Sequence, residues 1–131
     1  MNLKIGELAA RTGCLPETIR YYEQRGLLSA PARSSGNYRL YGAVHVDRLT
    51  FIRRCRSLDM SLDEVQALLA LQDEPEQPCG GVNDLVDHHI ELLRAKIDEL
   101  KALQDELLKL RASCQSTVRV RECKILRDLI S

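Results

Sequence analysis

Apolar residues recur every three or four positions over the first 30 residues, in short segments that end at glycine or proline. This spacing predicts two short amphipathic helices. Gly13 suits the turn between them because glycine adopts a positive φ without strain. Pro16 suits the first turn of the second helix, and Gly26 suits the position just beyond its end. We therefore expect a helix-turn-helix over about residues 4–26.

A turn sequence follows this motif. Ser35, Gly36 and Asn37 favour a tight turn, and polar and apolar residues alternate after it. This pattern predicts a small β-hairpin, or wing, over about residues 31–41.

Two further amphipathic helices are predicted, over about residues 43–58 and 61–71. The apolar positions of the first keep a three- and four-residue spacing: Val44, Leu49, Phe51, Ile52, Cys55 and Leu58. The second helix opens on a capping box, in which the Ser61 hydroxyl and the Glu64 carboxylate satisfy each other's backbone donors.

The C-terminal half contains one long helical pattern over residues 82–112, which no glycine or proline interrupts. Its apolar residues follow the alternating spacing of a coiled coil. The predicted dimer seam consists of Val86, Ile90, Leu93, Ile97, Leu100 and Leu107. A helix of about 30 residues is about 45 Å long, and no other segment is large enough to cover this stripe. We therefore expect a homodimer in which a second copy covers it.

The predicted organisation has four parts, and its fold class is all-α dominated. They are an N-terminal helical domain with the hairpin wing (1–72), a linker loop (73–81), a dimerisation helix (82–112), and a loop with a short helix (113–131).

Charge is distributed unevenly although the net charge is zero. Residues 1–60 hold ten basic and five acidic side chains, whereas residues 61–131 hold nine basic and fourteen acidic ones. A basic N-terminal half predicts a head that binds a polyanion. No apolar run reaches the roughly 18 residues that a membrane span requires, and the first residues lack the apolar core of a signal peptide. We therefore expect a cytoplasmic protein with no membrane partner.

Arginines and tyrosines crowd the basic half. Guanidinium groups suit phosphate oxygens and guanine edges, and tyrosine hydroxyls can donate to phosphates. The candidate contacts to double-stranded DNA are Thr18, Arg20, Tyr21, Arg33, Tyr38, Arg39, Tyr41 and Arg53. The same predicted cluster contains Arg25, Arg48, Arg54 and Arg56. Tyr22 is three residues from Ile19 and is expected in the core instead.

Three stretches together resemble the MerR family of transcription regulators: residues 5–9, 18–23 and 36–41. Similarity continues through residues 51–53 and 58–62 to the C-terminal cysteines, so it covers essentially the whole chain. The resemblance implies a winged-helix head, two further helices, a long antiparallel dimerisation helix and a sensor loop, in a protein that is not an enzyme. It also implies that the dimer activates transcription by distorting promoter DNA so that RNA polymerase can engage it, a mechanism that relies on DNA deformability.

Three cysteines flank the long helix. Cys79 precedes it, whereas Cys114 and Cys123 follow it, so within one chain the first thiol lies far from the other two. In an antiparallel dimer, the start of one helix meets the end of its partner. Cys79 of one copy can then join Cys114 and Cys123 of the other, which predicts two three-thiolate metal sites.

The donor set of these sites favours soft metal ions. Residues 113–123 supply thiols, no histidine and one acid, Glu122, whereas zinc usually recruits a fourth ligand. The residues around Cys79 and Cys123 resemble the lead- and cadmium-responsive branch of the family, so we expect lead(II) (Pb²⁺) first and cadmium(II) (Cd²⁺) next. The alternatives are a mercury(II)- (Hg²⁺) or zinc(II)-responsive (Zn²⁺) regulator of the same family, or a thiol-based redox-sensing DNA-binding protein.

The remaining cysteines and histidines carry weaker predictions. Cys14 and Cys55 are expected to be small core residues, and His45 has no evident partner. A second metal site at the start of the long helix stays open, although a seam or surface role is favoured for its candidates, Asp87, His88 and His89.

Overall fold

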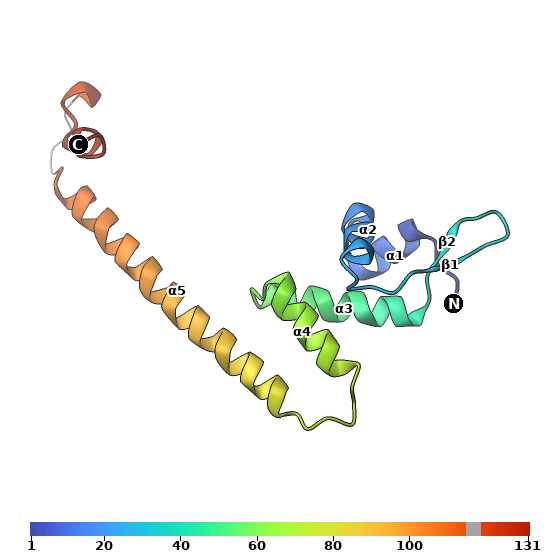
Figure 1. Ribbon diagram of the computed structural model, residues 1–131. Helices are drawn as coiled ribbons and strands as arrows, with labels where there is room; N and C mark the ends of the chain where they lie inside the picture. The colour runs from blue at the N-terminus through green and yellow to red at the C-terminus, as the bar shows by residue number, and fades with distance from the viewer. Residues whose placement is uncertain (115–118) are drawn as a thin grey trace. The chain divides into compact units, whose positions relative to one another are not determined.

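The computed structural model describes residues 1–114 and 119–131 (Figure 1). Its chain divides into two compact units, residues 1–85 and 86–131. The elements are α1 (Ile5–Thr12), α2 (Pro16–Gln24), β1 (Ala32–Arg33), β2 (Arg39–Leu40), α3 (Ala43–Ser57), α4 (Leu62–Gln72), α5 (Gly80–Ala112), a 3₁₀ turn η1 (Val120–Glu122) and α6 (Lys124–Asp128). The helix-dominated fold with a hairpin, a long helix and a short C-terminal helix is therefore confirmed.

Local capping defines the first two helices. α1 ends at Thr12 and is capped by Gly13, which has a φ of 73°, and α2 begins with Pro16 at its first position. Gly26, with a φ of 75°, follows α2, and the Leu27 N–H donates to the Tyr22 carbonyl at 2.9 Å. These are the bonds of a Schellman motif, so Gly13 and Gly26 occupy the left-handed positions that the sequence predicts.

The wing is a two-stranded antiparallel hairpin. Ala32 pairs with Leu40 and Arg33 pairs with Arg39. Asn37 supplies the left-handed residue of the turn, with a φ of 65°. An isolated bridge between Leu3 and Tyr41 attaches the N-terminal segment to the base of the wing.

The buried stripe of α3 differs in part from the expected one. Leu49, Ile52 and Cys55 are buried as expected, but Val44 and Leu58 are 70% and 47% exposed. His45 occupies the buried position at the N-terminal end of the stripe. The predicted stripe was wrong at this end because it was built from apolar residues alone, and histidine is not one of them.

His45 is buried because both of its ring nitrogens have partners. Its Nδ1 accepts from the Gly42 N–H at 3.0 Å, which places the ring proton on Nε2. That Nε2 lies 3.2 Å from the Ser29 carbonyl oxygen and donates to it, and the ring packs edge-on against Tyr41. The expectation that His45 lacks a partner is therefore wrong.

The core of the first unit lies among its four helices and the base of the wing. Its fully buried side chains are Leu8, Ile19, Leu27, Tyr41, Leu49, Ile52, Val65 and Leu69. The predicted capping box at the start of α4 is present, with the Ser61 N–H donating to Glu64 at 2.9 Å and the Glu64 N–H donating to the Ser61 hydroxyl at 3.1 Å.

α5 begins at Gly80, two residues earlier than expected. The Cys79 carbonyl accepts from the Asn83 N–H at 3.1 Å, so the helical bonds start directly after the cysteine. Of the helices within residues 1–114 and 119–131, none is both long and apolar enough to cross a bilayer.

Candidate DNA interface and metal-binding cysteines

The helix-turn-helix is tied to α3 through one arginine. Nη1 of Arg53 donates to the Thr12 carbonyl at 2.8 Å, at the C-terminal end of α1. A β-carbon placed on Gly13 would lie 2.0 Å from this same nitrogen. Arg53, predicted as a DNA contact, thus also holds the turn between α1 and α2, and the side chain stays exposed.

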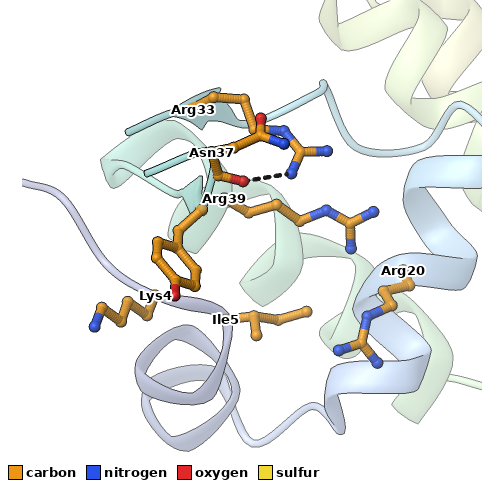
Figure 2. A pocket seen from close by; sticks show the side chains of 7 residues that line it. Lys4, Ile5, Arg20, Arg33, Asn37 and Arg39 are labelled. Atoms are coloured by element: carbon orange, nitrogen blue, oxygen red, sulfur yellow. Dashed lines mark hydrogen bonds between the residues drawn. The ribbon is translucent and has the colours of Figure 1, made fainter. Parts of the chain in front are cut away.

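A basic cavity of about 320 Å³ opens between the start of α1, α2 and the wing (Figure 2). Its lining is Lys4, Ile5, Arg20, Arg33, Asn37, Tyr38 and Arg39. Four of these side chains are cationic and none is acidic. Arg20 comes from α2, whereas Arg33 and Arg39 come from the hairpin, so two separate elements present guanidinium groups to one hollow. Such an arrangement suits an anion of the size of a phosphate group.

Two polar residues of this cavity, Lys4 and Asn37, were not among the predicted DNA contacts. Nζ of Lys4 lies 5.8 Å from the centre of the Tyr38 ring, and the Asn37 carbonyl accepts from Nη1 of Arg33 at 3.1 Å (Figure 2). The bridge between Leu3 and Tyr41 brings the N-terminal segment next to the wing. No local pattern signals this bridge, although the positive charge of Lys4 was a clue.

The other predicted DNA contacts differ in exposure. Tyr38 is 66% exposed and Tyr21 is 44% exposed, and the Tyr21 hydroxyl accepts from Nη1 of Arg25 at 3.0 Å. Thr18 is half-buried in α2, whereas Arg20 on the same helix is exposed. These side chains remain available for a contact, and their contacts to DNA stay predictions.

The structure contradicts the prediction for Tyr41. Its side chain is 1% exposed, and its hydroxyl donates to a carboxylate oxygen of Glu23. Burial and the neighbouring Glu23 carboxylate raise the pKa of Tyr41 to about 12. Tyr41 is therefore a core residue that connects the wing to α2, with no hydroxyl free for phosphate.

Three of the clustered arginines also have structural partners. Arg25 forms an ion pair with Asp63 at 3.3 Å, and Arg56 donates to the Met60 carbonyl at 2.7 Å. Arg48 binds Asp73 through two nitrogens. The arginine cluster is therefore divided between the exposed interface and the internal contacts of the fold.

The cysteines fall into two groups. Cys55 is buried, and burial raises the pKa of its thiol; Cys14 packs partly buried against the same core. Both therefore match the predicted core role. Cys79 is exposed just before α5, and Cys114 and Cys123 are half-buried.

None of the five cysteines, which all lie within the described residues, forms a disulfide, and the three at the ends of helices supply donors of one soft kind. Within residues 1–114 and 119–131 of a single copy, no group of three Cys, His, Asp or Glu side chains could hold a metal ion. This statement includes Asp87, His88 and His89. Part of the predicted sensor loop, residues 115–118, lies outside the described residues.

The predicted seam of α5 is largely exposed in the single chain. Val86, Ile90, Ile97, Leu100 and Leu107 are between 38% and 65% exposed, and Leu93 is half-buried. A row of large apolar side chains this exposed on one helix is typical of a protein interface.

A helix-turn-helix with a basic wing, followed by a long helix with an exposed apolar stripe, defines a DNA-binding regulator rather than an enzyme. The comparisons agree. The family model described as "MerR HTH family regulatory protein" matches residues 3–72, and the model described as "MerR, DNA binding" matches residues 46–110.

Individual relatives span nearly the same length. The HTH-type transcriptional regulator ZntR homolog of Haemophilus influenzae is 47% identical over 83% of this chain and 81% of its own. The mercuric resistance operon regulatory protein of Bacillus cereus is 38% identical over 99% and 98%. The solved structure of the transcription regulator PbrR691 from Ralstonia metallidurans CH34, in complex with lead(II), has a TM-score of 0.85 and 55% identity, over 97% and 98%.

The chain therefore belongs to the MerR family of transcription regulators. It is a metal-responsive regulator that binds DNA, and it is not an enzyme. Regulators of this family bind promoter DNA as dimers.

Proposed function

We propose that this chain is a cytoplasmic, homodimeric activator of transcription that responds to lead(II). Each metal site is shared between two copies, with Cys79 from one and Cys114 and Cys123 from the other. On metal binding, the dimer distorts its promoter so that RNA polymerase can engage it and transcribe resistance genes.

The placement of the three thiols around α5 carries the shared-site proposal. α5 has 33 residues, so its ends are about 50 Å apart at about 1.5 Å per residue. Cys79 directly precedes the helix, and Cys114 and Cys123 follow it. A second, antiparallel copy brings these ends together, and the exposed seam supplies the apolar surface that such a pairing buries.

Soft thiolate donors support a thiophilic ion. Three thiolates suit lead(II), because its lone pair tolerates a one-sided pyramidal site, and the lead(II) complex of PbrR691, 55% identical to this chain, supports the same ion. Cadmium(II) is the next candidate. The similarity to the mercuric resistance regulator of Bacillus cereus supports mercury(II) as a further candidate. Titrations in which lead(II), cadmium(II), mercury(II) and zinc(II) compete for the purified dimer decide among these ions.

The basic cavity supports the mode of DNA binding. The three cavity arginines and one lysine bind a backbone phosphate: Arg20, Arg33, Arg39 and Lys4. The exposed side chains of Tyr21, Tyr38 and Arg53 make further contacts with the DNA. Contacts of this kind set the position of the head on the duplex.

A mixed dimer tests the shared site directly. Cys79→Ser and Cys114→Ser are co-expressed with different tags, and the heterodimer is isolated. One of its two sites then keeps all three thiols, whereas the other site has lost two. We expect no lead site in either variant homodimer and one site per heterodimer, measured by lead-to-thiolate charge-transfer absorption and by stoichiometry.

The control is Cys14→Ser, which removes a thiol of the core group and should keep two sites per dimer. A heterodimer without any lead site contradicts sharing between copies. Full lead affinity in the Cys79→Ser homodimer contradicts the role of that ligand.

A further inference from the structure

One guanidinium group in the first unit connects the segment after α2 to the end of α4. Nε of Arg48 donates to the Leu27 carbonyl at 3.1 Å. Its Nη1 and Nη2 donate to the two carboxylate oxygens of Asp73 at 2.9 and 3.2 Å. Arg48 thus uses all three of its nitrogens, and a planar fork of this kind fixes the relative orientation of its partners.

The first partner, Leu27, directly follows the helix-turn-helix. It is 1% exposed and is the residue whose N–H closes the C-terminal motif of α2. One turn earlier in α3, His45 binds the Ser29 carbonyl. α3 therefore holds the segment that follows α2 at two carbonyls, those of Leu27 and Ser29.

The second partner, Asp73, opens the loop that leads to Cys79. The Asp73 N–H donates to the Leu69 carbonyl at 3.0 Å, and the Glu74 and Gln77 N–H groups close two further turns. A β-carbon on Gly81 would lie 3.3 Å from Cδ2 of Leu71, so the two ends of the loop are held close together. The Arg48 guanidinium, through its hydrogen bonds, holds the pKa of the Asp73 carboxyl below its usual range.

We propose that Arg48 is a positioning residue that couples the Cys79 loop to the helix-turn-helix through its paired bonds to Asp73 and Leu27. This inference rests on the proposed function, because it takes Cys79 as a metal ligand. When Cys79 is drawn into a site shared with the partner copy, the loop pulls on Asp73, and Arg48 transmits the displacement to the end of α2. The residue touches neither DNA nor metal in this role.

The chain contains a matched control for this bridge. Arg25 pairs with Asp63 at 3.3 Å, which also joins the end of α2 to α4, but at the other end of α4. Both carboxylates are well exposed, at 60% for Asp73 and 90% for Asp63, and exposed ion pairs contribute little to stability. Asp73→Asn and Asp63→Asn therefore each remove one exposed ion pair to α4, with two hydrogen bonds at Asp73 and one at Asp63, and only the pair of Asp73 lies next to the Cys79 loop.

The experiment compares wild type, Asp73→Asn and Asp63→Asn with lead(II) as the probe. Lead affinity is measured by absorption, operator affinity by fluorescence anisotropy, and metal response by transcription in vitro with and without lead(II). We expect Asp73→Asn to reduce the lead-induced activation by about threefold or more, because residues along a coupling network change it by this order. Lead affinity and metal-free operator affinity should stay within about twofold of wild type, and Asp63→Asn should keep the full response.

Two results overturn the inference: a full response in Asp73→Asn, or an equal loss in Asp63→Asn. If wild type itself shows no lead-induced activation, the proposed function fails and the coupling fails with it. If wild type responds and Asp73→Asn responds equally, the coupling alone is wrong.

Discussion

At the scale of single residues, burial changes what a side chain can do. Tyr41 lies two residues after Arg39 in a basic motif, and the sequence pattern therefore predicted it as a DNA contact. In the structure its ring is enclosed and its hydroxyl donates to Glu23, 18 residues earlier. Composition and charge indicate which side chains could bind a phosphate, but only tertiary contacts decide which of them are exposed.

The raised pKa of Tyr41 predicts an alkaline effect on stability. Below the pKa of 10.0 that a tyrosine has in the unfolded chain, the side chain is neutral in both the folded and the unfolded state, and its full contribution to folding stability is present. As the pH rises from 10 toward the folded value of about 12, the unfolded chain ionises first. Over this pH range, the free energy of unfolding of wild type should therefore fall by up to about 1.4 kcal/mol per pH unit relative to that of Tyr41→Phe.

Urea unfolding at about pH 8 and about pH 11 measures this difference. The exposed Tyr38 provides the control, because Tyr38→Phe should keep the wild-type dependence on pH. An equal loss of stability in wild type and Tyr41→Phe between these pH values would contradict a raised pKa of Tyr41 in the folded chain.

At the scale of elements, the sequence predicts helix ends well and internal contacts poorly. The glycines after α1 and α2 and the capping box of α4 are local features, and a few neighbouring residues determine them. The bond from Arg53 to Thr12 spans 41 positions, and the burial of His45 depends on the Ser29 carbonyl. Contacts between residues so far apart leave no periodic pattern in the sequence. An arginine that bonds within the fold therefore cannot be distinguished in the sequence from one that contacts DNA.

Gly13 offers a test at this scale. Its φ of 73° disfavours any side chain, and a β-carbon would displace Nη1 of Arg53, 2.0 Å away. We expect Gly13→Ala to lower the free energy of unfolding by about 2 kcal/mol, from left-handed strain plus the lost bond to Thr12. Unfolding by urea, at one fixed protein concentration, measures the change.

Gly6→Ala is the matched control. Apart from its chain neighbours and the backbone of its own helix, no heavy atom lies within 4 Å of its added β-carbon, and the position is helical, so alanine should stabilise the chain by about 0.5 kcal/mol. Two substitutions of the same kind at opposite ends of α1 should thus change the free energy of unfolding in opposite directions. A neutral Gly13→Ala would mean that the turn relaxes without loss of the Arg53 contact.

At the scale of the whole molecule, the sequence pattern identifies an interface that one copy leaves open. The stripe on α5 is readable because seven-residue periodicity is a property of the helix alone. The proposed metal site is not readable in the same way, because its three thiols lie far apart in the chain and would meet only through a partner copy. Cysteine spacing could therefore suggest the ligands, whereas their geometry depends on the dimer.

Leu100→Asp tests the seam. The side chain is 55% exposed in one copy, and pairing would bury it twice, once in each copy. Two lost apolar contacts of about 1.5 kcal/mol or more each should weaken the dimer about 100-fold or more. Sedimentation equilibrium at micromolar concentration measures the shift to monomer.

Ala102→Asp introduces the same charge on the opposite face of α5, about 160° from the stripe at about 100° per residue, and should remain dimeric. A dimeric Leu100→Asp would place the interface elsewhere on the molecule.

The division of the thiols into an exposed and an enclosed group has a consequence for cells under oxidative stress. Cys79 meets solvent directly, whereas Cys55 is 6% exposed and burial raises the pKa of its thiol. Peroxides attack accessible thiolates first, so an oxidising burst modifies the helix-end cysteine before it reaches the interior. If Cys79 is a metal ligand, as proposed, this oxidation blocks the response to metal and leaves the buried core thiol intact, and reduction of a sulfenic acid or disulfide at Cys79 restores the ligand.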